Sequence, residues 1–168
     1  QMTDDERYML RALELASLGM GCAAPNPMVG AVLVHEGRII GEGYHHRSGM
    51  PHAEVMAVAS VQARDLLPQS TLYVTLEPCS HYGKTPPCAE LIIRERIPRV
   101  VVATQDPFPQ VSGRGIQLLR DAGIEVIVGV LEGEARRLNA PFITTQTKHR
   151  PFVSLKWAQS LDGFIDRL

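Results

Sequence analysis

The residues with the clearest potential for chemistry in this chain are one histidine, one glutamate and two cysteines. His52 and Glu54 stand two residues apart, and Cys79 and Cys88 follow later, each directly after a proline. One imidazole and two thiols make three zinc ligands, and three protein ligands leave the fourth tetrahedral position open for water. A closed structural zinc site has no use for a carboxylate two residues after its histidine. The pattern therefore predicts a catalytic zinc site with these three ligands, in which Glu54 carries protons.

The order of these residues matches a known chemical motif. A His-x-Glu segment followed by Pro-Cys and a second cysteine is typical of zinc-dependent nucleobase deaminases. The usual motif places two residues between the cysteines, whereas eight separate Cys79 from Cys88 here. Gly83 and the pair Pro86-Pro87 allow the intervening segment to turn back on itself. We therefore expect a loop that begins and ends at the metal and places polar residues within reach of a bound substrate.

Two other interpretations of the same residues stay open. His81 stands two residues after Cys79, and as a fourth ligand it would close the site and make the domain a non-catalytic zinc module. Glu54 would then be an acidic residue that suits the positive end of a helix. A redox-active thiol pair is disfavoured, because eight residues separate the two cysteines. The remaining cysteine, Cys22, is interpreted as a small, partly buried thiol.

The composition is that of an ordinary globular domain. With 168 residues, 45% of them hydrophobic and 21% charged, the chain is long enough for one α/β domain with a substantial core. The chain has 17 basic and 18 acidic residues, so it lacks the excess of positive charge that is typical of proteins that bind long nucleic acids. Its apolar runs are far shorter than the roughly 20 residues that span a bilayer. The acidic start has no apolar signal-peptide stretch, so a cytoplasmic location is the expectation.

Helical and strand periodicities alternate along the chain. An apolar stripe between an N-cap at Thr3 and a helix end at Gly19 predicts an N-terminal helix. A β-hairpin with its turn at Glu36-Gly37 is predicted to follow. His52 and Cys88 fall at predicted helix starts, where backbone N–H groups favour negative charge. Because strands and helices alternate in the second half, we predict an α/β fold with three layers, α/β/α, around a central mixed five-stranded sheet. The expected strands cover residues 29–34, 38–43, 71–76, 99–104 and 124–128, and the later helices residues 53–63, 88–96, 113–121 and 132–139.

Longer segments add a resemblance to a known family. They are Pro25-Asn26-Pro27-Met28-Val29-Gly30, Gly43-Tyr44-His45, Pro51-His52-Ala53-Glu54, the block from Thr75 to Cys88, Asp106-Pro107, Gly113-Arg114-Gly115 and Ala122-Gly123-Ile124. Together they resemble the bifunctional deaminase-reductases of riboflavin biosynthesis, which have a cytidine deaminase-like fold. The resemblance covers nearly all of residues 5–145, and the eight-residue spacing of the cysteines is similar to that of this branch.

The resemblance implies an activity and a set of site residues. The reaction would be hydrolytic removal of the 2-amino group of 2,5-diamino-6-ribosylamino-4(3H)-pyrimidinone 5′-phosphate, giving 5-amino-6-ribosylamino-uracil 5′-phosphate and ammonia. It implies one Zn²⁺ per chain, held by the three ligands named above, with Glu54 as the proton carrier. Asn26, His45, His81 and Lys84 are implied as substrate contacts. Lys84 offers a point charge to a phosphate, and Asn26 offers both a donor and an acceptor to a ring edge.

The resemblance also divides the chain. Residues 1–145 would form the deaminase domain, residues 146–150 a polar linker, and residues 151–168 the stub of a truncated reductase domain. NADPH would bind only in the missing part of that reductase. The expected partner is a small pyrimidine ribotide, without nucleic acid or membrane, and a homo-oligomer is a further expectation. A deaminase of cytidine or of a tRNA adenosine stays the alternative enzyme.

Two features near the expected phosphate stay open. The helix start at Gly113-Arg114-Gly115 would either offer backbone N–H groups to the phosphate or serve as a flexible cap. Phe108 stands where the family commonly has asparagine, so a contact made by that asparagine is not carried over to this chain.

Overall fold

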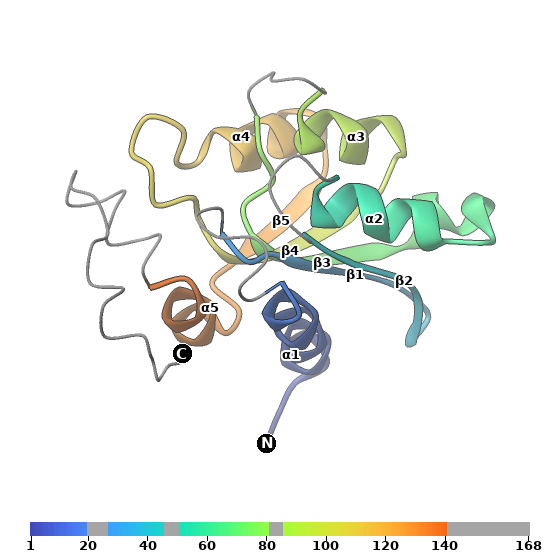
Figure 1. The fold of residues 1–168 in the computed structure, drawn as a ribbon. Coiled ribbons are helices and arrows are strands. Elements are labelled where there is room, and N and C mark those ends of the chain that lie inside the picture. The colour runs from blue at the N-terminus through green and yellow to red at the C-terminus, as the bar shows by residue number, and fades with distance from the viewer. Residues whose placement is uncertain (20–26, 46–50, 81–85, 141–168) are drawn as a thin grey trace.

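A five-stranded sheet lies at the centre of the computed structural model, which describes residues 1–19, 27–45, 51–80 and 86–140 (Figure 1). The strand order is β2-β1-β3-β4-β5. β1 pairs antiparallel with β2 and β3, whereas β4 pairs parallel with both β3 and β5. The predicted mixed sheet is therefore confirmed. The strands are β1 (Gly30–His35), β2 (Arg38–Tyr44), β3 (Thr71–Leu76), β4 (Arg99–Thr104) and β5 (Glu125–Val128).

The β1–β2 hairpin turns at Glu36-Gly37, as the sequence predicts. The backbone φ is 49° at Glu36 and 77° at Gly37. Positive φ at both central residues is the geometry of the two-residue turns that match the twist of paired strands. β2 then runs to Tyr44, and the N–H of His45 still donates to the carbonyl oxygen of Val29 at 3.0 Å. The hairpin therefore fixes the place of His45, one of the predicted substrate contacts.

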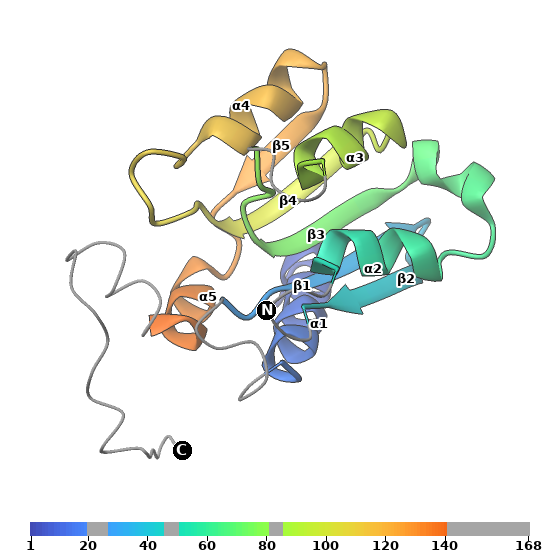
Figure 2. The same ribbon diagram turned by 45° about the horizontal axis from the view of Figure 1, so that its top comes forward.

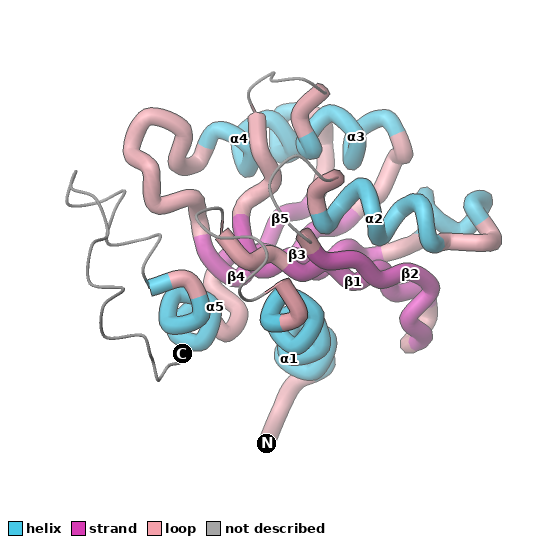
Figure 3. The backbone as a smooth tube through the Cα atoms, in the orientation of Figure 1, coloured by secondary structure: helices cyan, strands magenta, loops and turns pink. Residues whose placement is uncertain are grey.

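Helices cover both faces of the sheet and complete the predicted three layers. Figure 2 shows the helices of one face side by side in chain order, and Figure 3 distinguishes helices, strands and loops by colour in the orientation of Figure 1. The fold class is therefore confirmed. In Figure 1, one face carries α1 (Asp4–Ser17) and α5 (Glu132–Leu138), and the other carries α2 (Ala53–Ser60), α3 (Cys88–Arg94) and α4 (Arg114–Asp121).

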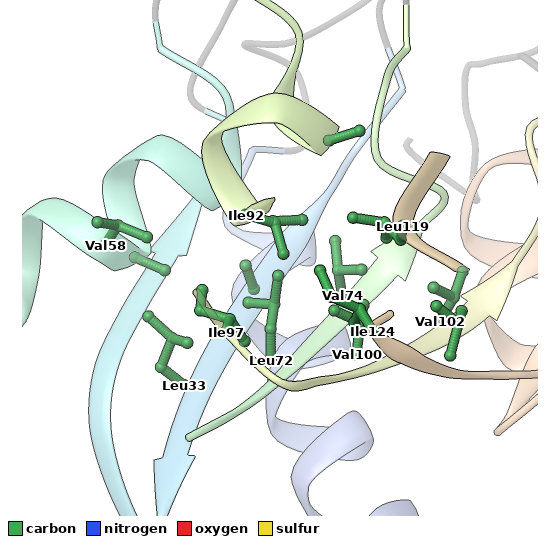
Figure 4. Packing of buried hydrophobic residues seen from close by; sticks show 14 of the residues in the cluster. Leu33, Val58, Leu72, Val74, Ile92, Ile97, Val100, Val102, Leu119 and Ile124 are labelled. Atoms are coloured by element: carbon green, nitrogen blue, oxygen red, sulfur yellow. The ribbon is translucent and has the colours of Figure 1, made fainter. Parts of the chain in front are cut away.

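Two hydrophobic clusters fill the space between the layers. On the face that carries three helices, Leu72, Val74 and Val100 of the sheet pack in one cluster with Ile92 of α3 and Leu119 of α4 (Figure 4). The intervening strand residues point to the opposite face. Because both faces are covered, the central strands are apolar almost throughout, as is usual for a sheet buried on two sides. The second cluster includes Met9, Leu13, Val32, Tyr73, Val101 and Ala135.

Some helix boundaries differ from the prediction. α2 ends at Ser60 instead of near residue 63, because Val61 adopts an extended backbone. The 3₁₀ helix η1 (Arg64–Gln69) was not predicted, since it has a proline inside and a single buried residue, and so lacks an apolar stripe. α3 ends at Arg94 instead of residue 96, because Arg96 has a φ of 61°. These differences leave the starts of the helices, where the candidate site residues stand, as predicted.

The tail of the chain lies outside the described residues. The expected linker at residues 146–150 and the expected reductase stub at residues 151–168 both belong to it. Within the described ranges, no helix is long and apolar enough to cross a membrane.

A charged cluster fastens the start of α1 to the sheet. Thr3 and Glu6 form a capping box, and Asp5 accepts hydrogen bonds from the Tyr73 hydroxyl at 2.6 Å and from Nη2 of Arg99 at 2.8 Å. The Arg99 hydrogen bond holds the pKa of Asp5 below its ordinary value, against the opposing effect of partial burial. A lowered carboxyl pKa means that the ionised form stabilises the folded state.

We expect Asp5→Asn to lower the free energy of unfolding at pH 7 by about 1.5–3 kcal/mol, the usual range for hydrogen bonds to charged groups. The folded pKa lies below the unfolded one, so this contribution is complete above about pH 4 and is lost as the pH falls through the folded pKa. Urea unfolding of both proteins at pH 7 and pH 3 measures the effect. An equal difference at the two pH values would contradict this role of Asp5.

Candidate active site

Three segments bring the predicted metal ligands together. His52 is the residue that precedes α2, and Cys88 is the first residue of α3, so both stand at helix starts as predicted. Cys79 follows the end of β3 by three residues. The His52 side chain makes no hydrogen bond that would cap α2. Its ring nitrogen Nδ1 faces the two sulfur atoms instead.

The three ligand atoms have the spacing of a tetrahedral metal site. Nδ1 of His52 lies 3.4 Å from Sγ of Cys88 and 3.9 Å from Sγ of Cys79, and all three atoms lie within 4.8 Å of one another. With zinc about 2.3 Å from sulfur and about 2.0 Å from nitrogen, tetrahedral angles place the nitrogen about 3.5 Å from each sulfur. The residues therefore fit zinc, and one imidazole with two thiolates is a donor set that leaves a coordination position open.

The start of α3 holds Cys79 directly. The N–H of Cys88 donates to Sγ of Cys79 at 3.1 Å, and the N–H of Ala89 donates to the carbonyl oxygen of Cys79 at 3.1 Å. Both belong to the amides that a helix start leaves without partners inside the helix. The segment between the cysteines thus returns to its starting point, and the helix start stabilises negative charge on the Cys79 sulfur.

Glu54 is buried beside these ligands. It is the second residue of α2, and only 4% of it is exposed. Burial raises the pKa of its carboxyl to about 7, and the nearby Cys79 adds to this effect. An acidic residue that served only the helix dipole would gain nothing from leaving water. A buried carboxyl that changes protonation near neutral pH is suited to carry protons.

The protein itself concentrates negative charge on one sulfur. The pKa of Cys79 is lowered, chiefly because the Cys88 thiol hydrogen-bonds to it and also because His52 does. The pKa of Cys88 is raised by the same hydrogen bond and by burial. The hydrogen bond to Cys79 likewise raises the pKa of His52. Since metal ligands must lose their protons, binding of a divalent cation would release protons from this cluster.

Of the four predicted substrate contacts, the structure describes one. His45 is buried, with 7% of it exposed, and its ring meets the His52 ring edge to face with 5.5 Å between the ring centroids. It therefore borders the ligand cluster. Asn26, His81 and Lys84 lie outside the described residues. The alternative role of His81 as a fourth zinc ligand therefore falls outside them as well.

Two glycines of β2 allow α2 to lie close against the sheet. A Cβ atom at Gly43 would stand 2.5 Å from the backbone nitrogen of Ala57 and 2.6 Å from the backbone oxygen of Ala53. A Cβ atom at Gly41 would stand 2.6 Å from the backbone oxygen of Ala57. Backbone atoms of a helix cannot give way singly, so the helix would have to move as a unit. The position of Glu54 therefore depends on the absence of side chains at these two places.

A further buried carboxylate belongs to Glu77, for which the sequence pattern predicts no role. It lies between β3 and Cys79, and it accepts hydrogen bonds from the N–H groups of Asp106, Gly113 and Ile116. These donors lie 29, 36 and 39 residues away in the sequence, so no local pattern predicts the contacts. The helix start at Gly113 therefore directs two of its amides, those of Gly113 and Ile116, to Glu77. This supports the cap interpretation of Gly113-Arg114-Gly115.

The arrangement of a His-Cys-Cys cluster with a buried glutamate on a mixed five-stranded sheet agrees with a comparison with known families. Residues 2–104 match the family described as the cytidine and deoxycytidylate deaminase zinc-binding region. This stretch includes the three candidate ligands and Glu54. The chain belongs to this family of zinc-binding deaminases.

Within the family, the similarity to proteins of riboflavin biosynthesis is high, which confirms the predicted resemblance. The chain is 58% identical to riboflavin biosynthesis protein RibD of Aquifex aeolicus over 164 residues, which are 98% of this chain and 46% of that protein. The chain thus spans about half the length of this curated relative. It is 50% identical to the Escherichia coli protein of the same name over 95% of this chain and 43% of that protein.

Two solved structures extend the similarity to the fold. The diaminohydroxyphosphoribosylaminopyrimidine deaminase/5-amino-6-(5-phosphoribosylamino)uracil reductase of Thermotoga maritima matches with a TM-score of 0.83 and 55% identity, over 88% of this chain and 42% of that chain. The Rib2 deaminase of Aspergillus oryzae, a C-terminal deletion mutant in complex with DARIPP, matches with a TM-score of 0.65 and 26% identity. This second match covers 87% of this chain and 97% of that chain.

Proposed function

We propose that this chain hydrolytically deaminates 2,5-diamino-6-ribosylamino-4(3H)-pyrimidinone 5′-phosphate, as the deaminase of riboflavin biosynthesis. The observation that carries the proposal is the buried carboxyl of Glu54 beside the cluster of His52, Cys79 and Cys88. Identity of 58% over nearly the whole chain to a riboflavin biosynthesis protein supports this choice of substrate. The complex of the Aspergillus oryzae deaminase with DARIPP supports a small ribotide as the ligand.

We assign one zinc ion per chain to His52, Cys79 and Cys88. Zinc in this position would polarise a water molecule and lower the pKa of that water toward about 7. Glu54 then accepts a proton from the attacking water, because its carboxyl is buried beside the ligand cluster in the first turn of the helix that follows His52. Glu54 next delivers this proton to a ring nitrogen while the water oxygen bonds to the ring carbon, and it then carries the remaining hydroxyl proton to the amino group, which leaves as ammonia. The C–N bond to the 2-amino group breaks and a carbonyl forms at the same carbon.

The substrate contacts remain part of the proposal. His45, buried next to the His52 ring, is placed to touch a ligand that approaches the cluster. Asn26, His81 and Lys84 are proposed as the other contacts, on the strength of the family resemblance alone. We further propose that residues 1–145 form the deaminase domain, and we assign no NADPH-dependent step to it.

The test is ammonia release by the purified chain from the pyrimidinone phosphate, with zinc quantified in the same sample. Cytidine and deoxycytidylate serve as control substrates, because the family includes their deaminases. Release from the pyrimidinone alone is the expected result. Stoichiometric zinc without any release, or release from cytidine instead, would overturn the proposal.

The close packing of α2 on β2 gives a prediction for this activity. Gly43→Ala is expected to push α2 away from the sheet and to lower kcat/KM at least tenfold, because a displacement of about 1 Å can cost two orders of magnitude. Gly133→Ala is the matched control: its Cβ would meet only the Arg137 side chain, at 3.5 Å, and alanine favours the helix. Steady-state kinetics of both variants measure the change in kcat/KM. Equal values would show that the distance between α2 and β2 does not matter for activity.

A further inference from the structure

We propose that Glu77 is a positioning residue for the metal centre. Its carboxylate fixes the place of Cys79 by fastening the Pro78-Cys79 segment to the loop between β4 and α4. Glu77 contacts neither the substrate nor the metal in this proposal and acts only through Cys79. The kinetic part of the inference rests on the proposed function, whereas its structural part does not.

The contacts of Glu77 are numerous for one side chain. Its Oε1 accepts from the N–H groups of Asp106 and Gly113, each at 3.0 Å, and its Oε2 accepts from the N–H of Ile116 at 3.1 Å. Its own N–H donates to the carbonyl oxygen of Thr104 at 3.0 Å. Glu77 is 5% exposed, so these hydrogen bonds lie away from water, where bonds to a charged acceptor are strong. The carboxylate therefore ties β3 to the loop after β4 and to the first turn of α4.

Pro78 extends the same attachment by one residue toward the metal centre. Its carbonyl oxygen occupies the space where a side chain at Gly115 would begin, so the contact needs glycine at that position. Two consecutive residues before Cys79 thus lie against the start of α4. Their positions are set by backbone atoms of a helix, which is the least deformable kind of neighbour.

The other side of Cys79 is fixed by a different helix. The N–H groups of Cys88 and Ala89, at the start of α3, bond to its sulfur and its carbonyl oxygen. Cys79 is therefore held between the starts of α4 and α3. Glu77 is the side chain whose hydrogen bonds make the first of these two attachments, so a single substitution there can loosen the sulfur on one side and leave the other side intact.

The variant that tests this role is Glu77→Gln. Glutamine keeps the size of the side chain, and its oxygen can still accept from Asp106 and Gly113. Its NH₂ group, however, would face the N–H of Ile116, and because both groups are donors this hydrogen bond would be lost. The chain is loaded with Co²⁺ in place of zinc, and the visible d–d absorption of the metal and the rate of its release to a chelator are measured.

We expect Glu77→Gln to change the cobalt spectrum and to release the metal at least tenfold faster, in the range known for residues that orient a metal ligand. With the pyrimidinone phosphate, kcat should fall more than KM rises. Asp5→Asn is the matched control, because it also removes a carboxylate that receives several hydrogen bonds, but on the opposite face of the sheet. It should lower the melting temperature without altering the spectrum or the release rate.

The inference is overturned if Glu77→Gln has the wild-type spectrum and release rate, or if Asp5→Asn alters both to the same degree. Should Glu77→Gln fail to fold, Gly115→Ala crowds Pro78 from the other side, and a folded Gly115→Ala protein with unchanged metal properties is equally decisive. The cobalt measurements need no substrate. If the chain lacked deaminase activity, the proposed function would be wrong, but the role of Glu77 could still be measured.

Discussion

Replacing Glu54 with glutamine is expected to lower kcat for ammonia release by roughly 10²–10⁴-fold, the usual contribution of a general acid–base group. Glutamine has the size of glutamate and fits the same buried position at the start of α2, but it cannot take up or deliver a proton. The three ligand residues are untouched, so the zinc content should stay that of the wild type. Ammonia release and zinc are therefore measured on the same preparations.

A matched control separates this role from that of a helix-start acid. Glu132 is an exposed acidic residue in the first turn of α5, on the opposite face of the sheet. Glu132→Gln removes the same charge from the same kind of helix position, and activity should not change. If Glu54→Gln were as active as Glu132→Gln, Glu54 would have no catalytic part and a structural zinc module would become the better interpretation.

The same substitution should make the metal-free protein more stable. Burial raises the pKa of Glu54 from 4.5 to about 7, so the folded state disfavours the ionised carboxyl. This penalty is absent below about pH 4.5, grows as the pH rises, and is complete above about pH 7. At pH 8, metal-free Glu54→Gln should therefore exceed metal-free wild type in unfolding free energy by on the order of 3 kcal/mol. Urea unfolding measures the difference, and a loss of stability at pH 8 would contradict the burial of a charged carboxyl.

Part of this site could be predicted because its residues carry chemical information in their spacing. His52 and Glu54 are two residues apart, and Cys79 and Cys88 each follow a proline, so the ligand set could be proposed without any structure. The structure brings these ligand atoms within 4.8 Å of one another. The strands were equally predictable, because sheets covered on both faces require apolar runs that differ clearly from the helical stripes.

Other features could not be predicted, because they join residues far apart in the chain. The carboxylate of Glu77 bonds to amides 29 to 39 residues away. Asn139 exchanges two hydrogen bonds with the backbone of Met28, which lies 111 residues away. In both cases the side chain replaces a missing backbone partner, and only the folded chain decides which partner is missing. η1 escaped prediction for a different reason, since one buried residue is too few for a periodicity.

Loss of one metal ligand is the second change with a large expected effect. Cys88→Ser keeps the shape of the side chain, but a hydroxyl at this position does not supply the thiolate that zinc binds. Zinc affinity should fall by more than the 10–100-fold known for loss of a residue that merely orients a ligand, and ammonia release should become undetectable. Cys22→Ser is the control for the loss of a thiol, since Cys22 is the remaining cysteine of the chain and stands outside the His-x-Glu and Pro-Cys pattern of the sequence.

Removal of zinc should abolish the activity without unfolding the protein. Small zinc domains unfold when their metal is removed, because the metal replaces a hydrophobic core. Here two apolar clusters hold the helices on both faces of the sheet, and the proposed ligands among the described residues join the starts of α2 and α3 to the segment that follows β3. We therefore expect a chelator to lower the melting temperature, to leave the far-ultraviolet circular dichroism nearly unchanged, and to give full recovery of activity when zinc is restored. Cooperative unfolding on chelation at 25 °C would mean that zinc, and not the core, organises this end of the sheet.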